Sequence, residues 1–402
     1  MTPAYRWIVL SLTLVMQMLV IGIGMYCFTF FAVAWVDEFA TSRSQLMMAF
    51  AGMTVMAALL SPFGGMLIDS FPARRLVMAG IALYSLGFLL ISQATQAWAV
   101  IAVFTLLMPM AVVLTGPLMS QSLVARVFEE KRGTAIGICA LGTSLGGFVM
   151  PPLLASLLAV MDWRIVAMLV AGVIGAGLLP LAFLILGAAP RPRPAGERTH
   201  GARSSVELIR NPDVLKLAIA YAIPAALFSA VLQNMGLYAR DLSVSQPQAG
   251  FIVSITAILM AGGKLSSGFL ADRISQAAIY YTLTGLAGAG ILLTALASDY
   301  PSLAAGVFLL GTTAGGLLPL IIVVASQRFG SENFGRVMGL IMAVASLSGL
   351  APLFAGWIRD LSGSYQPAFM LLLPLLLLAA FCFYRLTKET VPIPSSQNAQ
   401  GQ

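Results

Sequence analysis

Residues 64–75 read GGMLIDSFPARR, and residues 267–275 read SGFLADRIS. In each stretch a glycine is followed four positions later by an aspartate, Gly65 with Asp69 and Gly268 with Asp272, and arginine comes after the aspartate. The two copies lie 203 positions apart, which is about half the length of the 402-residue chain. A repeat of this period indicates two similar halves, so we expect each half to fold as its own bundle.

Long apolar runs alternate with short polar breaks along both halves. A helix needs about 20 apolar residues to cross the hydrocarbon core of a bilayer, and each of twelve runs reaches about that length. Spans are therefore predicted near residues 6–36, 45–67, 76–95, 98–124, 133–160, 165–188, 214–237, 247–270, 277–297, 301–327, 336–358 and 366–385.

The composition requires a lipid environment. Hydrophobic residues make up 59% of the chain and charged residues 9%, whereas a soluble domain carries roughly a quarter charged residues. The net charge of +7 arises from short clusters between the apolar runs, not from a basic stripe of the kind that binds nucleic acid. Cys27, Cys139 and Cys382 are dispersed in apolar runs, so we expect no disulfide framework, no metal site and no cofactor.

The predicted domains are an N-terminal six-helix bundle, a cytoplasmic linker, a C-terminal six-helix bundle and a flexible cytoplasmic tail, at residues 1–188, 189–213, 214–387 and 388–402. Nearly all Lys and Arg residues of the loops fall on the side of the membrane that holds both termini. The exceptions are Arg43, Arg164, Arg240 and Arg359. The positive-inside rule then places both termini in the cytoplasm, and we expect a multi-pass protein of the cytoplasmic (inner) membrane.

The repeated glycine–aspartate motif, between the second and third spans and again between the eighth and ninth, resembles that of the major facilitator superfamily. The resemblance covers essentially the whole chain. It implies an all-α membrane protein with twelve transmembrane helices in two pseudo-symmetric six-helix bundles that rock about a central cavity. It also implies a gating role for a set of residues that could otherwise only anchor the loops: Gly65, Asp69, Arg74, Arg75, Gly268, Asp272 and Arg273.

One charged residue, Lys264, falls well inside a predicted span. A bare ammonium in the hydrocarbon core costs at least about 2.5–3.5 kcal/mol, and no carboxylate occupies the centre of any predicted span. We interpret Lys264 as the partner of a bound anion. The alternative is that its side chain reaches the cytoplasmic headgroups or bonds backbone carbonyl groups.

The stretch YCFTFFAVAWVDEFATSRSQ, residues 26–45, resembles the corresponding part of monocarboxylate and oxalate/formate-type carriers. Those carriers have a basic residue four positions before the glycine of the second motif, as Lys264 precedes Gly268, and the resemblance implies that it binds the substrate carboxylate. The family residue is usually Arg, and proton-coupled members have Asp where this chain has Met260. Anion exchange, or proton coupling through Lys264 itself, is therefore favoured over a carboxylate relay.

Polar and aromatic residues of four other spans are candidates to line the cavity. We expect them either to contact the substrate or to serve only in packing and interhelical hydrogen bonds. They are Tyr26, Phe28, Thr115, Gln233, Asn234, Thr312 and Thr313.

These features favour a secondary active or facilitative transporter of a small organic anion, a monocarboxylate, with a proton or a counter-anion as the second partner. The alternative is an exporter of hydrophobic or drug-like compounds in which Lys264 is structural. The predicted spans lack the convergent acid, base and nucleophile that an enzyme requires, so no catalytic activity is expected.

Overall fold

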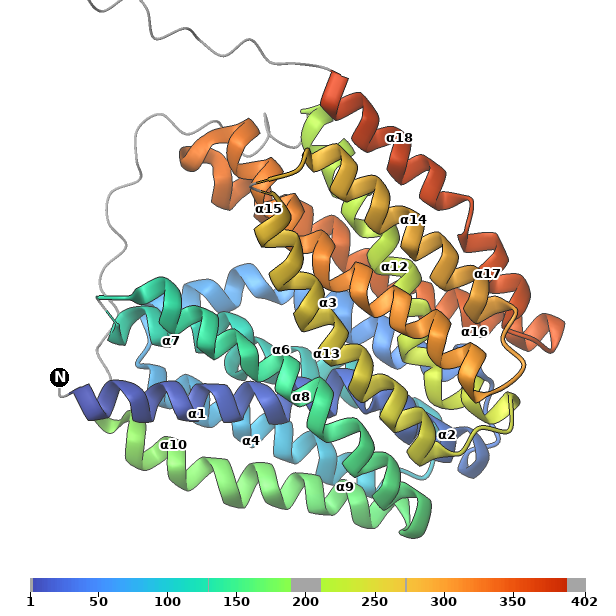
Figure 1. Cartoon of the computed structure of the whole chain (residues 1–402). Helices are drawn as coiled ribbons and strands as arrows, with labels where there is room; N and C mark the ends of the chain where they lie inside the picture. Colours follow the sequence, from blue (N-terminus) through green and yellow to red (C-terminus); the bar gives the residue numbers. More distant parts are fainter. Residues whose placement is uncertain (1–2, 129, 189–210, 272, 389–402) are drawn as a thin grey trace, which may run out of the picture.

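The computed structural model describes residues 3–128, 130–188, 211–271 and 273–388 (Figure 1). Most of the predicted linker and nearly all of the predicted tail lie outside these ranges, and so does Asp272.

The described residues contain 12 helices that are long and apolar enough to cross a membrane, which confirms the predicted fold class. Because no water is available in hydrocarbon, helices satisfy every backbone hydrogen bond internally. The first half contains α1 (Pro3–Ile21), α2 (Phe28–Glu38), α3 (Arg43–Ser70), α4 (Ala73–Ser92), α5 (Ala97–Ala102), α6 (Met108–Thr115), α7 (Pro117–Val127), α8 (Arg132–Val160), α9 (Trp163–Gly172) and α10 (Leu179–Ile185). The second half contains α12 (Pro212–Asp241), α13 (Gln246–Ala271), α14 (Gln276–Ala295), α15 (Tyr300–Ala345), α16 (Leu350–Ser362), α17 (Gln366–Leu372) and α18 (Leu375–Lys388).

Several spans are interrupted near their middle. The first is not one regular helix over 6–36, because a π-helical turn at Gly22–Tyr26 separates α1 from α2. The fourth breaks at Gly116, whose backbone is extended, and Pro117 then starts α7. Such interruptions free backbone groups and redirect side chains, and π-helical turns are frequent at functional sites.

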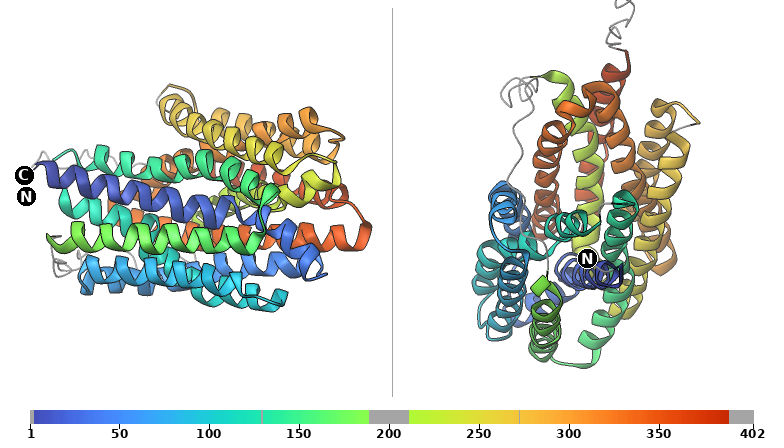
Figure 2. Two further views of the ribbon diagram at one scale, coloured as in Figure 1. Left: turned by 90° about the horizontal axis from the view of Figure 1, so that it is seen from below. Right: turned by 90° about the vertical axis from the view of Figure 1, so that its left-hand side faces the viewer.

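The two halves meet along only part of their length. We call the end of the molecule where α1 and α12 begin the terminal end, and the opposite end the far end. Between the halves, α2 packs on α12, α3 on α16, and α8 on α13. Figure 1 shows the halves close together at the far end and diverging toward the terminal end. In the end-on view of Figure 2 (right), most of the first half lies below the second half.

Within the first half, α1 and α8 approach closely at Gly146. A methyl group at this position would lie 2.4 Å from the carbonyl oxygen of Met18 and 3.0 Å from the Cα atom of Gly22. Small residues let helix backbones pack tightly in a membrane, where no hydrophobic driving force acts between helices.

We expect Gly146→Ala to lower the free energy of unfolding by about 1–3 kcal/mol, because the added methyl group overpacks the contact between α1 and α8. The measurement is thermal unfolding of the purified protein in detergent. Gly137→Ala on the same helix is the control, since a methyl group there meets no atom within 4 Å and alanine favours helix by up to about 1 kcal/mol. Equal destabilisation by both substitutions would contradict this account of the packing.

Candidate functional site

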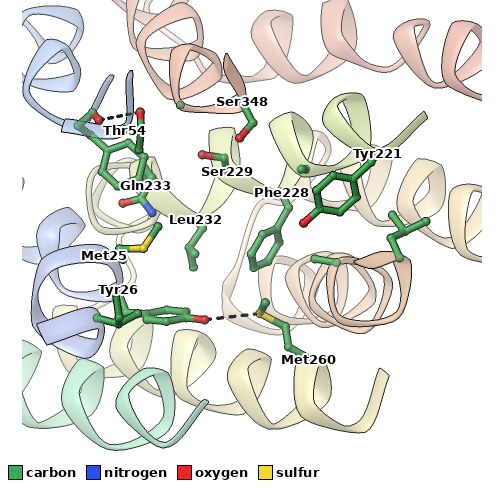
Figure 3. A pocket seen from close by; sticks show the side chains of 16 residues that line it. Met25, Tyr26, Thr54, Tyr221, Phe228, Ser229, Leu232, Gln233, Met260 and Ser348 are labelled. Atoms are coloured by element: carbon green, nitrogen blue, oxygen red, sulfur yellow. Dashed lines mark hydrogen bonds between the residues drawn. The ribbon is translucent and has the colours of Figure 1, made fainter. Parts of the chain in front are cut away.

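A cavity of about 260 Å³ lies between the two halves (Figure 3). Its walls come from the end of α1, the π-helical turn, α3, α12, α13, α15 and a 3₁₀ turn at Ser346–Gly349. The lining residues are Ile21, Met25, Tyr26, Phe50, Thr54, Tyr221, Ala225, Phe228, Ser229, Leu232, Gln233, Met260, Ala314, Leu317, Ser348 and Gly349. Apolar side chains predominate, as is usual in small-molecule sites.

Helix α12 supplies the longest wall of the cavity. Its lining residues recur every three or four positions, from Tyr221 through Ala225 and Ser229 to Gln233. This spacing keeps side chains on one face of an α-helix. Gln233 faces the cavity, whereas the next residue, Asn234, points about 100° away around the helix.

Four polar side chains of the lining have no hydrogen bond to another described residue: Tyr221, Ser229, Gln233 and Ser348. Gln233 is only 2% exposed, and its Oε1 atom is buried without a partner. Buried polar atoms in folded proteins nearly always have partners. These groups are therefore available to a ligand or to water inside the cavity.

Tyr26 and Met260 connect the two halves across the cavity. The hydroxyl of Tyr26 donates to the Sδ atom of Met260 at 3.9 Å, which is a weak bond because a thioether is a poor acceptor. Lys264 lies one helical turn further along α13, about 6 Å closer to the terminal end. It is not among the residues that line the cavity.

Lys264 is half-buried, and no hydrogen bond or ion pair joins it to another residue in the described part of the chain. Directly beside it, Gly263 packs against the backbone of Thr312 on α15. Every other charged side chain in the described spans lies near an end of its span. Lys264 is thus the one interior charge in that part of the molecule.

The remaining predicted contact residues make internal contacts and do not line the cavity. Asn234 donates to the carbonyl oxygens of Ala230 and Pro352 and accepts from Tyr365. Phe28 belongs to an aromatic cluster with Trp35, Phe50 and Phe104. The hydroxyls of three threonines bond to backbone carbonyl groups in their own helices, and these are Thr115, Thr312 and Thr313.

The far end is closed by ion pairs between the halves. Arg43 of α3 forms two hydrogen bonds to the carboxylate of Asp241 on α12, at 2.5 and 2.7 Å, and only 7% of its side chain is exposed. Arg359 on α16 also contacts Asp241, at 3.1 Å. Asp360 accepts from the backbone N–H of Ser44 at the start of α3, at 2.9 Å. We call Arg43, Asp241, Arg359 and Asp360 the far-end network.

An exposed ion pair between Arg240 and Asp37, at 2.7 Å, flanks the far-end network. We did not predict these contacts from the sequence. The sequence does contain a signal for them, because four arginines are expected on the side of the membrane opposite the termini. Three of the four stand within two positions of an aspartate: Arg164, Arg240 and Arg359.

The residues of the repeated motif lie at the terminal end. Asp69 pairs with Arg126 at 3.4 Å, not with Arg74 or Arg75. The two motif glycines, Gly65 and Gly268, make no close helix contact. A methyl group at either position meets no atom within 4 Å, because the halves have diverged there.

The motif arginines make aromatic contacts within their own halves. Arg74 stacks over the ring of Phe183 and Arg273 over the ring of Phe269, with 3.7 and 3.8 Å to the ring centres. Asp272 lies outside the described residues. A gating role for the motif stays a prediction.

Two helical bundles around a central cavity, closed at one end and separated at the other, define a membrane transporter. The profile of the Major Facilitator Superfamily matches residues 14–350 and, in a second alignment, 217–402. The chain belongs to this superfamily. It is a multi-pass membrane protein and a transporter, not an enzyme.

Its relatives include Monocarboxylate transporter 13 of Bos taurus, which is 29% identical over 77% of this chain and 72% of that protein. Monocarboxylate transporter 11 of Homo sapiens is 28% identical over 82% of this chain and 72% of its own length. Among solved structures, a bacterial homologue of the human lysosomal transporter Spinster, inward-facing and unoccupied, superposes with a TM-score of 0.80. That structure is 16% identical, and the match covers 96% of this chain and 98% of the other.

We expect Asp241→Asn to open the far end, because it leaves the buried Arg43 without a charged partner. The ratio of closed to open molecules should fall at least about ten-fold, which corresponds to about 1.4 kcal/mol. Nitroxide labels at Gln93 and Ser298, on far-end loops of the two halves, would report a second, longer distance by pulsed electron paramagnetic resonance.

Asp37→Asn is the matched control for the far-end network. It breaks the exposed pair with Arg240, and exposed pairs contribute about 0–1 kcal/mol, so the distance distribution should change little. The native cysteines are buried and should not compete for the label. Identical distance distributions for Asp241→Asn and the unmodified protein would show that the pair of Arg43 and Asp241 does not hold the far end closed.

Proposed function

We propose that the protein carries a small organic anion, a monocarboxylate, across the cytoplasmic membrane by alternating access, with Lys264 as the anchor for the carboxylate. The observation that carries the proposal is the interior position of Lys264 without a described partner. An ammonium held in this position at a cost of several kcal/mol is typical of a substrate or ion pathway. A bound carboxylate would supply the missing charge.

The cavity lies within reach of this charge. Met260 lines the cavity and lies one turn from Lys264 on the same face of α13. The Tyr26 hydroxyl, which donates to the thioether of Met260, would gain a stronger acceptor in a carboxylate. The relatives' names add support, because several of them are monocarboxylate transporters.

The proposed cycle uses the divergence of the halves. In the structure the far end is closed by ion pairs, while the hydrogen bonds and ion pairs joining the described parts of the halves are concentrated there and around the cavity. We assign the terminal end to the cytoplasm by the excess of Lys and Arg. The described conformation is then inward-facing, and the far-end network would break when the carrier faces outward.

In this proposal, substrate transport is not coupled to proton movement through a carboxylate in the cavity. Met260 occupies the position at which proton-coupled carriers of the resembled type have an aspartate, and no Asp or Glu is among the lining residues. The proposal therefore favours exchange for a counter-anion, or proton uptake and release at Lys264.

A carrier of uncharged hydrophobic compounds is the second candidate, because most of the lining is apolar. In that case Lys264 would contribute only to structure. The two candidate functions differ in whether transport requires the ammonium group of Lys264.

We expect Lys264→Gln to raise the KM for anion uptake at least about ten-fold, because a charge-assisted hydrogen bond contributes about 1.5–3 kcal/mol. Lys264→Arg keeps the charge and should retain most of the uptake. The measurement is uptake of labelled monocarboxylates into proteoliposomes, together with thermal unfolding of each variant.

The thermal stability of Lys264→Gln should match or exceed that of the unmodified protein, since the side chain has no partner among the described residues to lose. Unchanged anion uptake by this variant would exclude the proposed anchor. Loss of uptake together with loss of stability would favour a structural role.

A further inference from the structure

The polar groups of the cavity that have no hydrogen bond to another described residue lie in two places with an apolar zone between them. Tyr221 lies on the terminal-end side, in the direction of Lys264. Gln233, Ser229 and Ser348 lie on the other side, and the side chains of Phe228 and Leu232 come between (Figure 3). Tyr221 and Gln233 are twelve residues apart on α12, which corresponds to about 18 Å along the helix.

Gln233, Ser229 and Ser348 form what we call the distal cluster. Gln233 and Ser229 are one turn apart on the same face of α12, and Ser348 approaches from the 3₁₀ turn before α16. None of the three makes a hydrogen bond to a described residue, and the Oε1 atom of Gln233 is fully buried. Leaving such groups unpaired is unfavourable, so a ligand that pairs with them is selected over one that does not.

The chemistry of the distal cluster is neutral. An amide and two hydroxyls can each donate and accept hydrogen bonds, but they carry no charge to balance a second carboxylate or an ammonium. The matching ligand group is therefore an uncharged hydroxyl, carbonyl or amide.

We propose that the distal cluster is a second recognition site, and that the substrates are monocarboxylates with a neutral hydrogen-bonding group at the end of the apolar body remote from the carboxylate. This inference rests on the proposed function, because it takes Lys264 as the anchor of the carboxylate. It adds a requirement that the anchor alone does not impose: simple apolar acids leave the distal cluster unpaired and are poorer substrates.

The test compares two acids that differ by one hydroxyl, phenylacetate and para-hydroxyphenylacetate, in proteoliposomes. The unmodified protein should take up the hydroxylated acid with a kcat/KM about ten- to a hundred-fold higher. Gln233→Leu should reduce this ratio to about one, mainly by lowering the kcat/KM for the hydroxylated acid. Ser229→Ala and Ser348→Ala make smaller changes in volume, and each should lower the ratio by a smaller factor.

Thr54→Val is the matched control. Thr54 lines the same cavity, but its hydroxyl already bonds to the carbonyl oxygens of Phe50 and Ala51 at 3.1 and 3.0 Å. The substitution keeps the shape of the side chain and removes a hydroxyl that is already hydrogen-bonded within its own helix. The preference for the hydroxylated acid should therefore persist.

Three results would overturn the inference. Equal uptake of both acids by the unmodified protein, with loss of both in Lys264→Gln, would refute the distal cluster and leave the anion carrier standing. If Gln233→Leu still takes up both acids and keeps the preference for the hydroxylated acid, the distal cluster is likewise refuted and the anion carrier stands. Uptake of neither acid by the unmodified protein would count against this inference and the proposed function together.

Discussion

The ion pair between Arg43 and Asp241 holds the two halves in the described arrangement. It is largely shielded from water, and the cost of withdrawing both charges from water is offset only while they stay together with their additional hydrogen bonds. Arg359 and the backbone carbonyl of Leu237 supply such bonds. With the far end fixed in this way, the cavity and the separation at the terminal end follow from the geometry of long, stiff helices.

In the proposed transport cycle, the same interaction explains how the closed far end would also be able to open. A far end sealed by apolar packing alone would gain nothing in water when it separated, whereas charged groups are well solvated there. Most of the energy that holds Arg43 and Asp241 together is therefore recovered as hydration when the halves part. A polar seal of this kind favours two states of similar energy, as the proposed cycle requires.

Much of the fold could be predicted from the sequence, since the bilayer permits few alternatives. Twelve apolar runs predict twelve helices because hydrocarbon leaves no other way to satisfy the backbone, and the repeat around Gly65 and Gly268 predicts two halves. The cavity was harder to predict. Gln233 and Asn234 are adjacent amides of similar chemistry, and only the rotation of α12 places one in the cavity and the other against Pro352 and Tyr365.

Hydroxyl residues pose the same difficulty. Thr312 and Thr313 bond to carbonyl groups of their own helix, whereas Ser229 and Ser348 do not, and nothing in the residue type distinguishes the two cases. The far-end network depends on contacts between residues up to 317 positions apart, which no local pattern encodes. Lys264 was identifiable because its charge is unusual at that depth regardless of its neighbours.

The polar groups of the cavity are unevenly divided between the halves. Tyr221, Ser229, Gln233 and Ser348 all belong to the second half, as does Lys264, while the first half contributes mainly Tyr26, Thr54 and apolar side chains. A substrate held by these groups would stay bound to the second half during transport. The first half would move relative to the substrate and would open or close access to it. Changes in the second half would then alter which molecules are held, and changes in the first half how quickly they are released.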